Sequence, residues 1–322
     1  MASFSRSHRR AGALAVPMLG IMTLLGCATT ATGPVGASPN NTPDTKAFEH
    51  VHGLGADSLT GDTYAATHQG VWLLPTGSLP DTYLEGAPRS TAVEATQIAG
   101  RAQDTMGFTV AAPGHLLASG HPAPTAQTEL ALPNLGLISS TDGARSWSAL
   151  SLEGETDFHD LAAVPLDNTL RVYGYDAGAG TISISDDSGV TWSAGAVLPL
   201  RDLTVDPARP DRVFASTAEG LVMSDDAART FDLVAGAPPL LLVETVDAAA
   251  GGGLIGIDTQ GALWRQETVA GAWTEKGMAN GPPEAFAFVG GSSPWILVAD
   301  ARGIAASDDY GLTWTELVPL AG

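Results

Sequence analysis

The sequence predicts an all-β protein built as a six-bladed β-propeller, and two repeats along the chain carry that prediction. An octapeptide occurs four times, and its copies begin at Ser140, Ser185, Ser224 and Ser307. A glycine that opens a short apolar run occurs six times, at Gly70, Gly136, Gly180, Gly220, Gly261 and Gly303. The first two copies are 66 residues apart, and the later ones follow at spacings of 40–44 residues. A period in the low forties is typical of a four-stranded propeller blade.

The four octapeptides follow the pattern Ser-x-Asp-x-Gly/Ala-x-Ser/Thr-Trp/Phe. This pattern resembles the Asp-box, or BNR repeat, of sialidase-type β-propellers. The carboxylate suits a tight hairpin because it accepts backbone N–H bonds across the turn, and the terminal aromatic ring packs between sheets. We therefore expect a structural role in the hairpin between the third and fourth strands of a blade for Asp142, Asp187, Asp226 and Asp309.

The N-terminal residues predict export and lipid anchoring. Residues 1–26 read as a signal peptide, because an Arg-rich start is followed by an uncharged apolar stretch from Ala11 to Gly26. The stretch ends in Leu24-Leu25-Gly26-Cys27, which resembles the bacterial lipobox and implies lipidation of Cys27. Residues 27–46 are rich in Thr, Pro and Gly and predict a flexible tether. Residues 47–322 remain for a single propeller domain, which we expect outside the cytoplasm on a bacterial cell membrane.

Composition excludes several classes of function. The chain carries 35 acidic and 15 basic residues, a net charge of −20, which repels nucleic-acid phosphates. A single cysteine excludes a disulfide framework and a Cys-based zinc site. We expect a monomer.

Two insertions interrupt the regular spacing and leave one alternative for the fold. They cover residues 77–101 and 121–134, and the second is expected as a long loop over the channel mouth. A seventh blade within residues 78–103 is the alternative to six blades. That stretch shows no second glycine-led strand, which favours six.

Histidines cluster where the repeat register predicts one face of the propeller. Inner-strand entries and the loops between second and third strands share that face. Five histidines fall there, all in the first three units, together with three carboxylates; the candidate set is His50, His52, His68, His121, His159, Asp104, Asp157 and Asp160. Imidazoles beside carboxylates suit a transition metal such as Cu²⁺ or Zn²⁺, or an acid/base pair. No catalytic residue can be assigned.

Segments beyond the octapeptides resemble a family of bacterial lipoproteins catalogued as glycosylhydrolase-like, among them Phe48–Gly55, Ala118–Pro122 and Asp157–Asp160. The resemblance implies a propeller and an extracytoplasmic location, whereas the family name derives from the fold. The arginine motif of true sialidases is absent, because its position reads Glu49-His50-Val51-His52. Three functions stay open: a module that binds a metal or a small polar ligand, a glycoside hydrolase, and a scaffold that recognises a protein.

Overall fold

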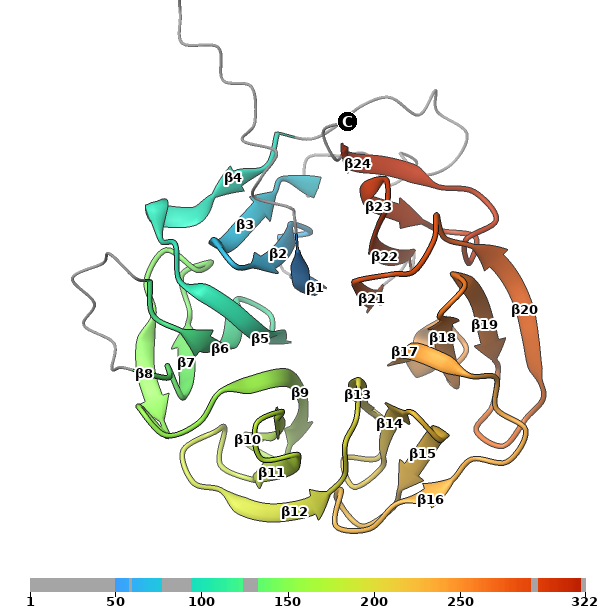
Figure 1. The fold of residues 1–322 in the computed structure, drawn as a ribbon, viewed down its shortest axis with the longest axis horizontal. Coiled ribbons are helices and arrows are strands. Elements are labelled where there is room, and N and C mark those ends of the chain that lie inside the picture. Colours follow the sequence, from blue (N-terminus) through green and yellow to red (C-terminus); the bar gives the residue numbers. More distant parts are fainter. Residues whose placement is uncertain (1–49, 58–59, 77–93, 124–132, 291–294, 320–322) are drawn as a thin grey trace, which may run out of the picture. The chain divides into compact units, whose positions relative to one another are not determined.

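The computed structural model describes residues 50–57, 60–76, 94–123, 133–290 and 295–319. Over these residues the chain forms six four-stranded antiparallel sheets, the blades, arranged as a ring (Figure 1). The six-bladed β-propeller predicted from the repeat period is confirmed. The signal peptide, the tether and Cys27 lie outside the described residues.

Each blade uses four consecutive strands, and the innermost comes first. The inner strands are β1 (Val51–Ala56), β5 (Asp104–Ala112), β9 (Phe158–Leu166), β13 (Asp202–Val205), β17 (Leu240–Thr245) and β21 (Ala285–Val289). The second strands are β2 (Thr63–Thr67), β6 (His115–His121), β10 (Thr169–Asp176), β14 (Val213–Thr217), β18 (Leu254–Asp258) and β22 (Trp295–Asp300). The third strands are β3 (Gly70–Leu74), β7 (Leu137–Ser140), β11 (Thr181–Ser185), β15 (Gly220–Ser224), β19 (Ala262–Gln266) and β23 (Gly303–Ser307). The outer strands are β4 (Thr96–Gln97), β8 (Ser148–Ser151), β12 (Ser193–Val197), β16 (Asp232–Leu233), β20 (Trp273–Met278) and β24 (Thr315–Pro319).

The first insertion supplies the outer strand of blade 1 rather than a seventh blade. Its residues Thr96 and Gln97 form β4 and pair with Leu73 and Trp72 of β3. A short 3₁₀ helix, η3 (Ile98–Gly100), then leads to blade 2, and a second one, η4 (Ala248–Ala250), lies in blade 5. Among the described residues no helix has the length and apolar character needed to cross a bilayer.

The octapeptides form the hairpins between the third and fourth strands, as predicted. In blade 3 the Asp187 carboxylate accepts hydrogen bonds from the Thr191 N–H at 2.8 Å and the Thr191 hydroxyl at 2.6 Å. Two copies carry Ala in place of Gly, and Ala144 and Ala228 adopt the left-handed backbone with φ of 63° and 58°. The hydrogen-bonded hairpin therefore holds a strained conformation that glycine would adopt freely.

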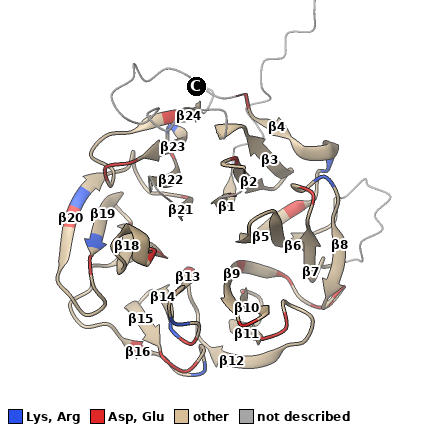
Figure 2. Cartoon of the chain, turned by 180° about the vertical axis from the view of Figure 1, so that it is seen from behind, with Lys and Arg blue, Asp and Glu red and all other residues tan. Residues whose placement is uncertain are grey.

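Apolar side chains between neighbouring blades hold the ring together. Blades 6 and 1 share one buried cluster that includes Val51 and Leu54 of β1 and Leu297 of β22. The ring closes by this packing, because β1 and β21 belong to different sheets. Polar contacts add to it: the buried Arg171 of blade 3 pairs with Asp186 of the same blade and with Asp211, which lies between β13 and β14 of blade 4. Figure 2 shows acidic residues on the connections of several blades and basic residues more sparsely.

Candidate functional site

The end of the ring at which the inner strands begin, called here the mouth, carries the predicted histidines. His50 directly precedes β1 and His52 is its second residue, while His68 lies in the turn between β2 and β3. Asp104 is the first residue of β5. Antiparallel order within each blade brings the start of an inner strand and the turn after the second strand to the same end. The prediction that these positions share a face is confirmed.

His52 occupies a β-bulge. In the β1–β2 ladder Val51 pairs with Thr67 and Gly53 pairs with Ala66, so His52 has no partner residue opposite it. A bulge bends the strand locally and re-aims the side chain. The imidazole of His52 thereby meets the ring of His68 edge to face, with 4.4 Å between their centroids.

Three donor atoms from two blades converge at the mouth, and we call this group the first group: His52, His68 and Asp104. His68 Nδ1 lies 3.3 Å from His52 Nε2 and 2.8 Å from Asp104 Oδ1. One ligand atom from each residue lies within 4.8 Å of the other two. A single proton on His68 Nδ1 is donated to Asp104, which leaves the His52 nitrogen as an acceptor.

Burial keeps the imidazole ring of His52 uncharged at neutral pH. It lowers the pKa of His52 to about 4, and the nearby His68 lowers it further while Asp104 opposes the change. The neutral ring presents a lone pair, which a metal requires. His50 stands beside the group, with its ring centroid 5.5 Å from that of His68, and it is exposed. Its imidazole is a further nitrogen donor beside the group.

The remaining two histidines gather around another carboxylate, and we call this set the second group: His121, Asp157 and His159. The Nε2 atoms of His121 and His159 lie 3.2 and 2.8 Å from the same oxygen, Asp157 Oδ2. His159 also occupies a bulge, because Phe158 pairs with Asp176 and Asp160 pairs with Tyr175. Four predicted histidines thus reach the mouth, but as two groups rather than one.

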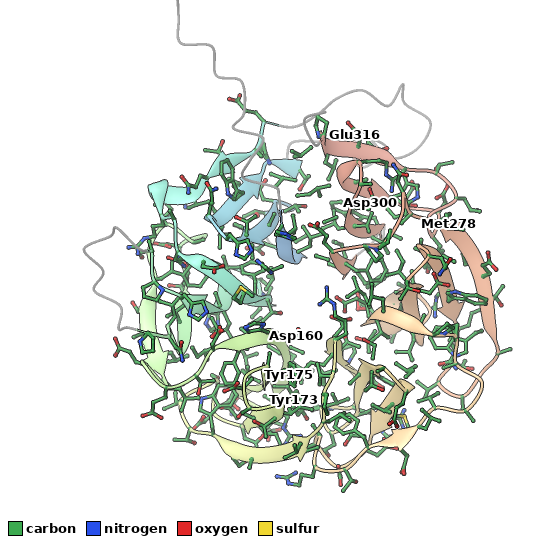
Figure 3. All side chains as sticks on the ribbon, in the orientation of Figure 1. Asp160, Tyr173, Tyr175, Met278, Asp300 and Glu316 are labelled. Atoms are coloured by element: carbon green, nitrogen blue, oxygen red, sulfur yellow. The ribbon has the colours of Figure 1, made fainter. Side chains whose placement is uncertain are left out.

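Asp160, also a predicted ligand candidate, is not a member of either histidine group. Its Oδ2 accepts a hydrogen bond of 2.7 Å from the backbone N–H of Leu203, which belongs to blade 4. Asp202 repeats this contact one blade further on, because its Oδ2 accepts from the Val243 N–H at 2.6 Å. Both carboxylates therefore fasten one inner strand to the next. Figure 3 shows Asp160 at the inner edge of blade 3.

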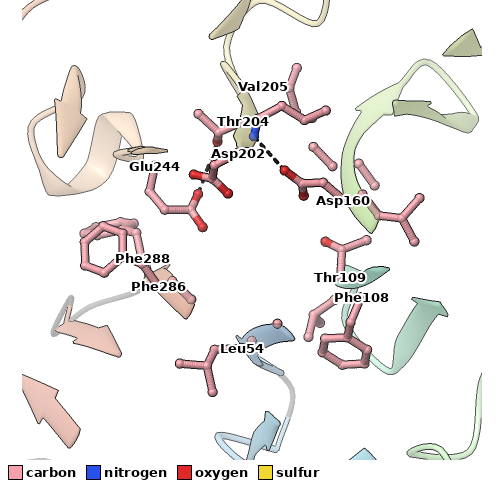
Figure 4. A pocket seen from close by; sticks show the side chains of 18 of the residues that line it. Leu54, Phe108, Thr109, Asp160, Asp202, Thr204, Val205, Glu244, Phe286 and Phe288 are labelled. Carbon is pink, nitrogen blue, oxygen red and sulfur yellow. Dashed lines mark hydrogen bonds between the residues drawn. The ribbon is translucent and has the colours of Figure 1, made fainter. Parts of the chain in front are cut away.

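A cavity of about 360 Å³ occupies the centre of the ring below the mouth. Figure 4 shows the carboxyl groups of Asp160, Asp202 and Glu244 at one side of it and Leu54 at the opposite side. Glu244 is the fifth residue of β17 and lies deeper in the channel, where its Oε2 accepts a 3.1 Å hydrogen bond from Thr204. These three residues form the channel carboxylates.

The channel carboxylates hold protons more tightly than free carboxylic acids do. Burial raises the pKa of Asp160 to about 6, against the effect of its backbone hydrogen bonds. Burial and the neighbouring charge of Asp160 raise the pKa of Asp202 well above its usual range. Burial raises the pKa of Glu244 to about 8. At neutral pH at least one of these carboxyl groups is therefore protonated and able to donate.

The two tyrosines of β10 bond to the backbone of the following segments. The Tyr173 hydroxyl donates to the carbonyl of Pro210 at 2.6 Å, and the Tyr175 hydroxyl accepts from the Leu200 N–H at 3.3 Å. Figure 3 shows both residues within the blade. These contacts hold blade 3 against blade 4, because Leu200 directly precedes β13 and Pro210 lies between β13 and β14.

The fold and the mouth together define an Asp-box six-bladed β-propeller with a His/His/Asp group. No protein-family model and no curated protein matches the chain. Solved structures do match it. Ycf48 bound to D1 peptide is 16% identical with a TM-score of 0.48, covering 84% of this chain and 82% of that one. Ycf48 from Cyanidioschyzon merolae is 15% identical with a TM-score of 0.46, covering 86% and 88%.

A glycoside hydrolase of family GH74 from Niastella koreensis is similar as well. It is 15% identical with a TM-score of 0.48, and the match covers 80% of this chain but 36% of that enzyme. At these identities the likeness concerns the propeller fold.

Proposed function

We propose that this protein is a lipid-anchored, extracytoplasmic propeller that binds a divalent transition-metal ion at its mouth through His52, His68 and Asp104. One observation carries the proposal: donor atoms from these three residues lie within 4.8 Å of one another. The three residues come from three separate segments of two blades. The fold thus holds them together without any contribution from sequence proximity.

The donor set and its spacing favour a borderline metal. Two imidazole nitrogens and one carboxylate oxygen suit Cu²⁺ or Zn²⁺. Metal–nitrogen bonds of about 2.0–2.1 Å in tetrahedral geometry separate two nitrogen ligands by roughly 3.3–3.4 Å. His52 Nε2 and His68 Nδ1 already lie 3.3 Å apart. A metal ion would replace the proton that His68 shares with Asp104, and three protein ligands leave a position for a small polar ligand.

The cellular part of the proposal rests on the N-terminal sequence. An apolar stretch that ends at the only cysteine, Cys27, supports processing and lipidation there. The resemblance to bacterial lipoproteins catalogued as glycosylhydrolase-like supports the same location. The metal site would then stand outside the cytoplasm, at the end of a tether.

Titration calorimetry of Cu²⁺ and Zn²⁺ into the purified full-length chain, without a polyhistidine tag, tests the metal proposal. We expect a Kd below about 100 μM near pH 7.5. His52→Ala and His68→Ala should each weaken binding at least about tenfold, since each removes a ligand. His115→Ala is the matched control, because His115 bonds Ser139 within blade 2 and is outside both groups. Absence of binding, or equal loss in the control, would contradict the proposal.

A glycoside hydrolase is the second candidate, and the channel carboxylates favour it. A hydrolase of this kind needs one carboxylic acid that stays protonated near neutral pH beside a second carboxylate. Glu244, with its pKa raised to about 8 by burial, meets the first requirement, and Asp160 lines the same cavity. Turnover of chromogenic glycosides that is lost in Glu244→Gln would support this function; absence of turnover over a panel of sugars would refute it.

A further inference from the structure

The second group has the features of a metal position in its own right. Its two imidazole nitrogens approach one carboxylate oxygen from two blades, since His121 ends β6 and His159 begins β9. The other carboxylate oxygen, Asp157 Oδ1, is buried and has no hydrogen-bond partner in the part of the chain that the structure describes. A buried carboxylate oxygen without a partner is costly unless a cation or donor reaches the group.

The tautomer of His121 strengthens this interpretation. Its Nδ1 lies 3.3 Å from the carbonyl oxygen of Pro133, which can only accept a hydrogen bond. Nδ1 therefore carries a proton, and Nε2, which faces Asp157 Oδ2 at 3.2 Å, is the nitrogen that a metal ion would bind. Metal-binding histidines in proteins characteristically donate their other N–H to a backbone carbonyl in this way.

The two groups are neighbours across one strand ladder. Asp104 of the first group and His121 of the second are directly paired residues of β5 and β6. Side chains of directly opposite residues project from the same face of a sheet, with Cβ atoms about 4.5–5.5 Å apart.

We propose that the mouth holds two adjacent divalent transition-metal ions, the second bound by His121, Asp157 and His159. The proposal rests on the proposed function, because it adds a position beside the first group. Asp104 supplies the carboxylate ligand of the first ion, and Asp157 supplies that of the second. Two cations so close together would present their open positions to the same ligand, which favours an anionic ligand with two oxygen donors, such as a carboxylate or a phosphate ester.

The test counts metal ions in the full-length chain after equilibration with Cu²⁺ or Zn²⁺ and removal of excess metal. Elemental analysis should give two ions per chain in the parent protein. The pair His121→Ala/His159→Ala should retain one ion, and the pair His52→Ala/His68→Ala should also retain one. Electron paramagnetic resonance of the Cu²⁺-loaded parent should show dipolar coupling between two ions, which both double variants lose. Circular dichroism of each variant confirms that it is folded.

Each other outcome has a separate meaning. One ion per chain that is lost with His52 and His68 but kept without His121 and His159 overturns the second position and leaves the proposed function intact. One ion that is lost in both double variants shows a single shared site and overturns the inference. Two ions that show no dipolar coupling overturn the adjacency. Binding of no ion refutes the proposed function itself.

Discussion

Replacing Glu244 by Gln should stabilise the protein at high pH and leave it nearly unchanged at low pH. The folded-state pKa of Glu244 is raised from 4.5 to about 8, chiefly by burial. Between these values the unfolded chain has released this proton while the folded chain retains it. The folded state therefore binds more protons, and the free energy of unfolding falls as pH rises through this window. Glutamine cannot ionise, so the free energy of unfolding of the variant does not fall for this reason as pH rises.

The size of the effect follows from the two pKa values. At about 1.4 kcal/mol for each pH unit between 4.5 and about 8, the raised pKa lowers the free energy of unfolding by at most roughly 5 kcal/mol. Glu244 faces the central cavity, and water there offsets part of the cost of ionising its buried carboxyl group. We expect the variant to gain about 2–4 kcal/mol relative to the parent between about pH 5 and pH 8.5. The amide oxygen can still accept the hydrogen bond from Thr204, so little packing is lost.

Urea unfolding followed by tryptophan fluorescence, in buffer with a chelator, measures this difference at each pH. Asp160 and Asp202 titrate in both proteins, and the difference between the proteins includes the effect of Glu244 on the pKa of Asp202. Glu219→Gln is the matched control, because the Glu219 side chain is exposed. A stability difference between Glu244→Gln and the parent that is the same at both ends of the pH range would refute the reasoning from burial.

Three further predictions concern the hairpins, the ring and the anchor. Asp187→Ala should lower Tm, because it removes the acceptor of two Thr191 hydrogen bonds, while metal binding stays unchanged below Tm; loss of binding in folded protein would show a direct role. The same bonds lower the pKa of Asp187 to about 2, so their contribution should be present at neutral pH and be lost as pH falls from about 4 through about 2. Arg171→Met should cost about 1–3 kcal/mol in urea unfolding, because it breaks the contacts to Asp186 and Asp211; an unchanged midpoint would contradict a role in joining blades 3 and 4. Cys27→Ala should move the protein from the membrane fraction to the soluble fraction or stop its processing, and an unchanged distribution and gel mobility would argue against lipidation.

The fold was predictable because its signals are local and repeated. Each octapeptide specifies its own hairpin through contacts such as those of Asp187 with Thr191, four residues away. Six copies of the glycine-led strand then fix the blade count. The two-residue strand β4 was not predictable, because Thr96 and Gln97 lie within an insertion that carries no octapeptide. Only pairing with β3 defines it as a strand.

For the candidate site, the sequence predicted which residues lie on one face of the ring but not how they group there. The register assigned His52, His68, His121 and His159 to the mouth, and they lie there. Their division into two groups depends on bulges at His52 and His159, which a sequence pattern does not reveal. The sequence left the contact of Asp160 open for a similar reason. A carboxylate at a strand entry can face the mouth or bind the N–H of the next blade, and only the distance to Leu203 distinguishes the two.

The most direct test of the metal proposal is anomalous X-ray diffraction at the metal absorption edge from crystals grown with Cu²⁺ or Zn²⁺. The account predicts an anomalous peak about 2.0–2.2 Å from His52 Nε2, His68 Nδ1 and a carboxylate oxygen of Asp104. These atoms come from a bulge, a turn and a strand start that only this fold brings together. Crystals that hold the metal elsewhere on the chain, or that hold none at these three residues at saturating metal, would contradict it.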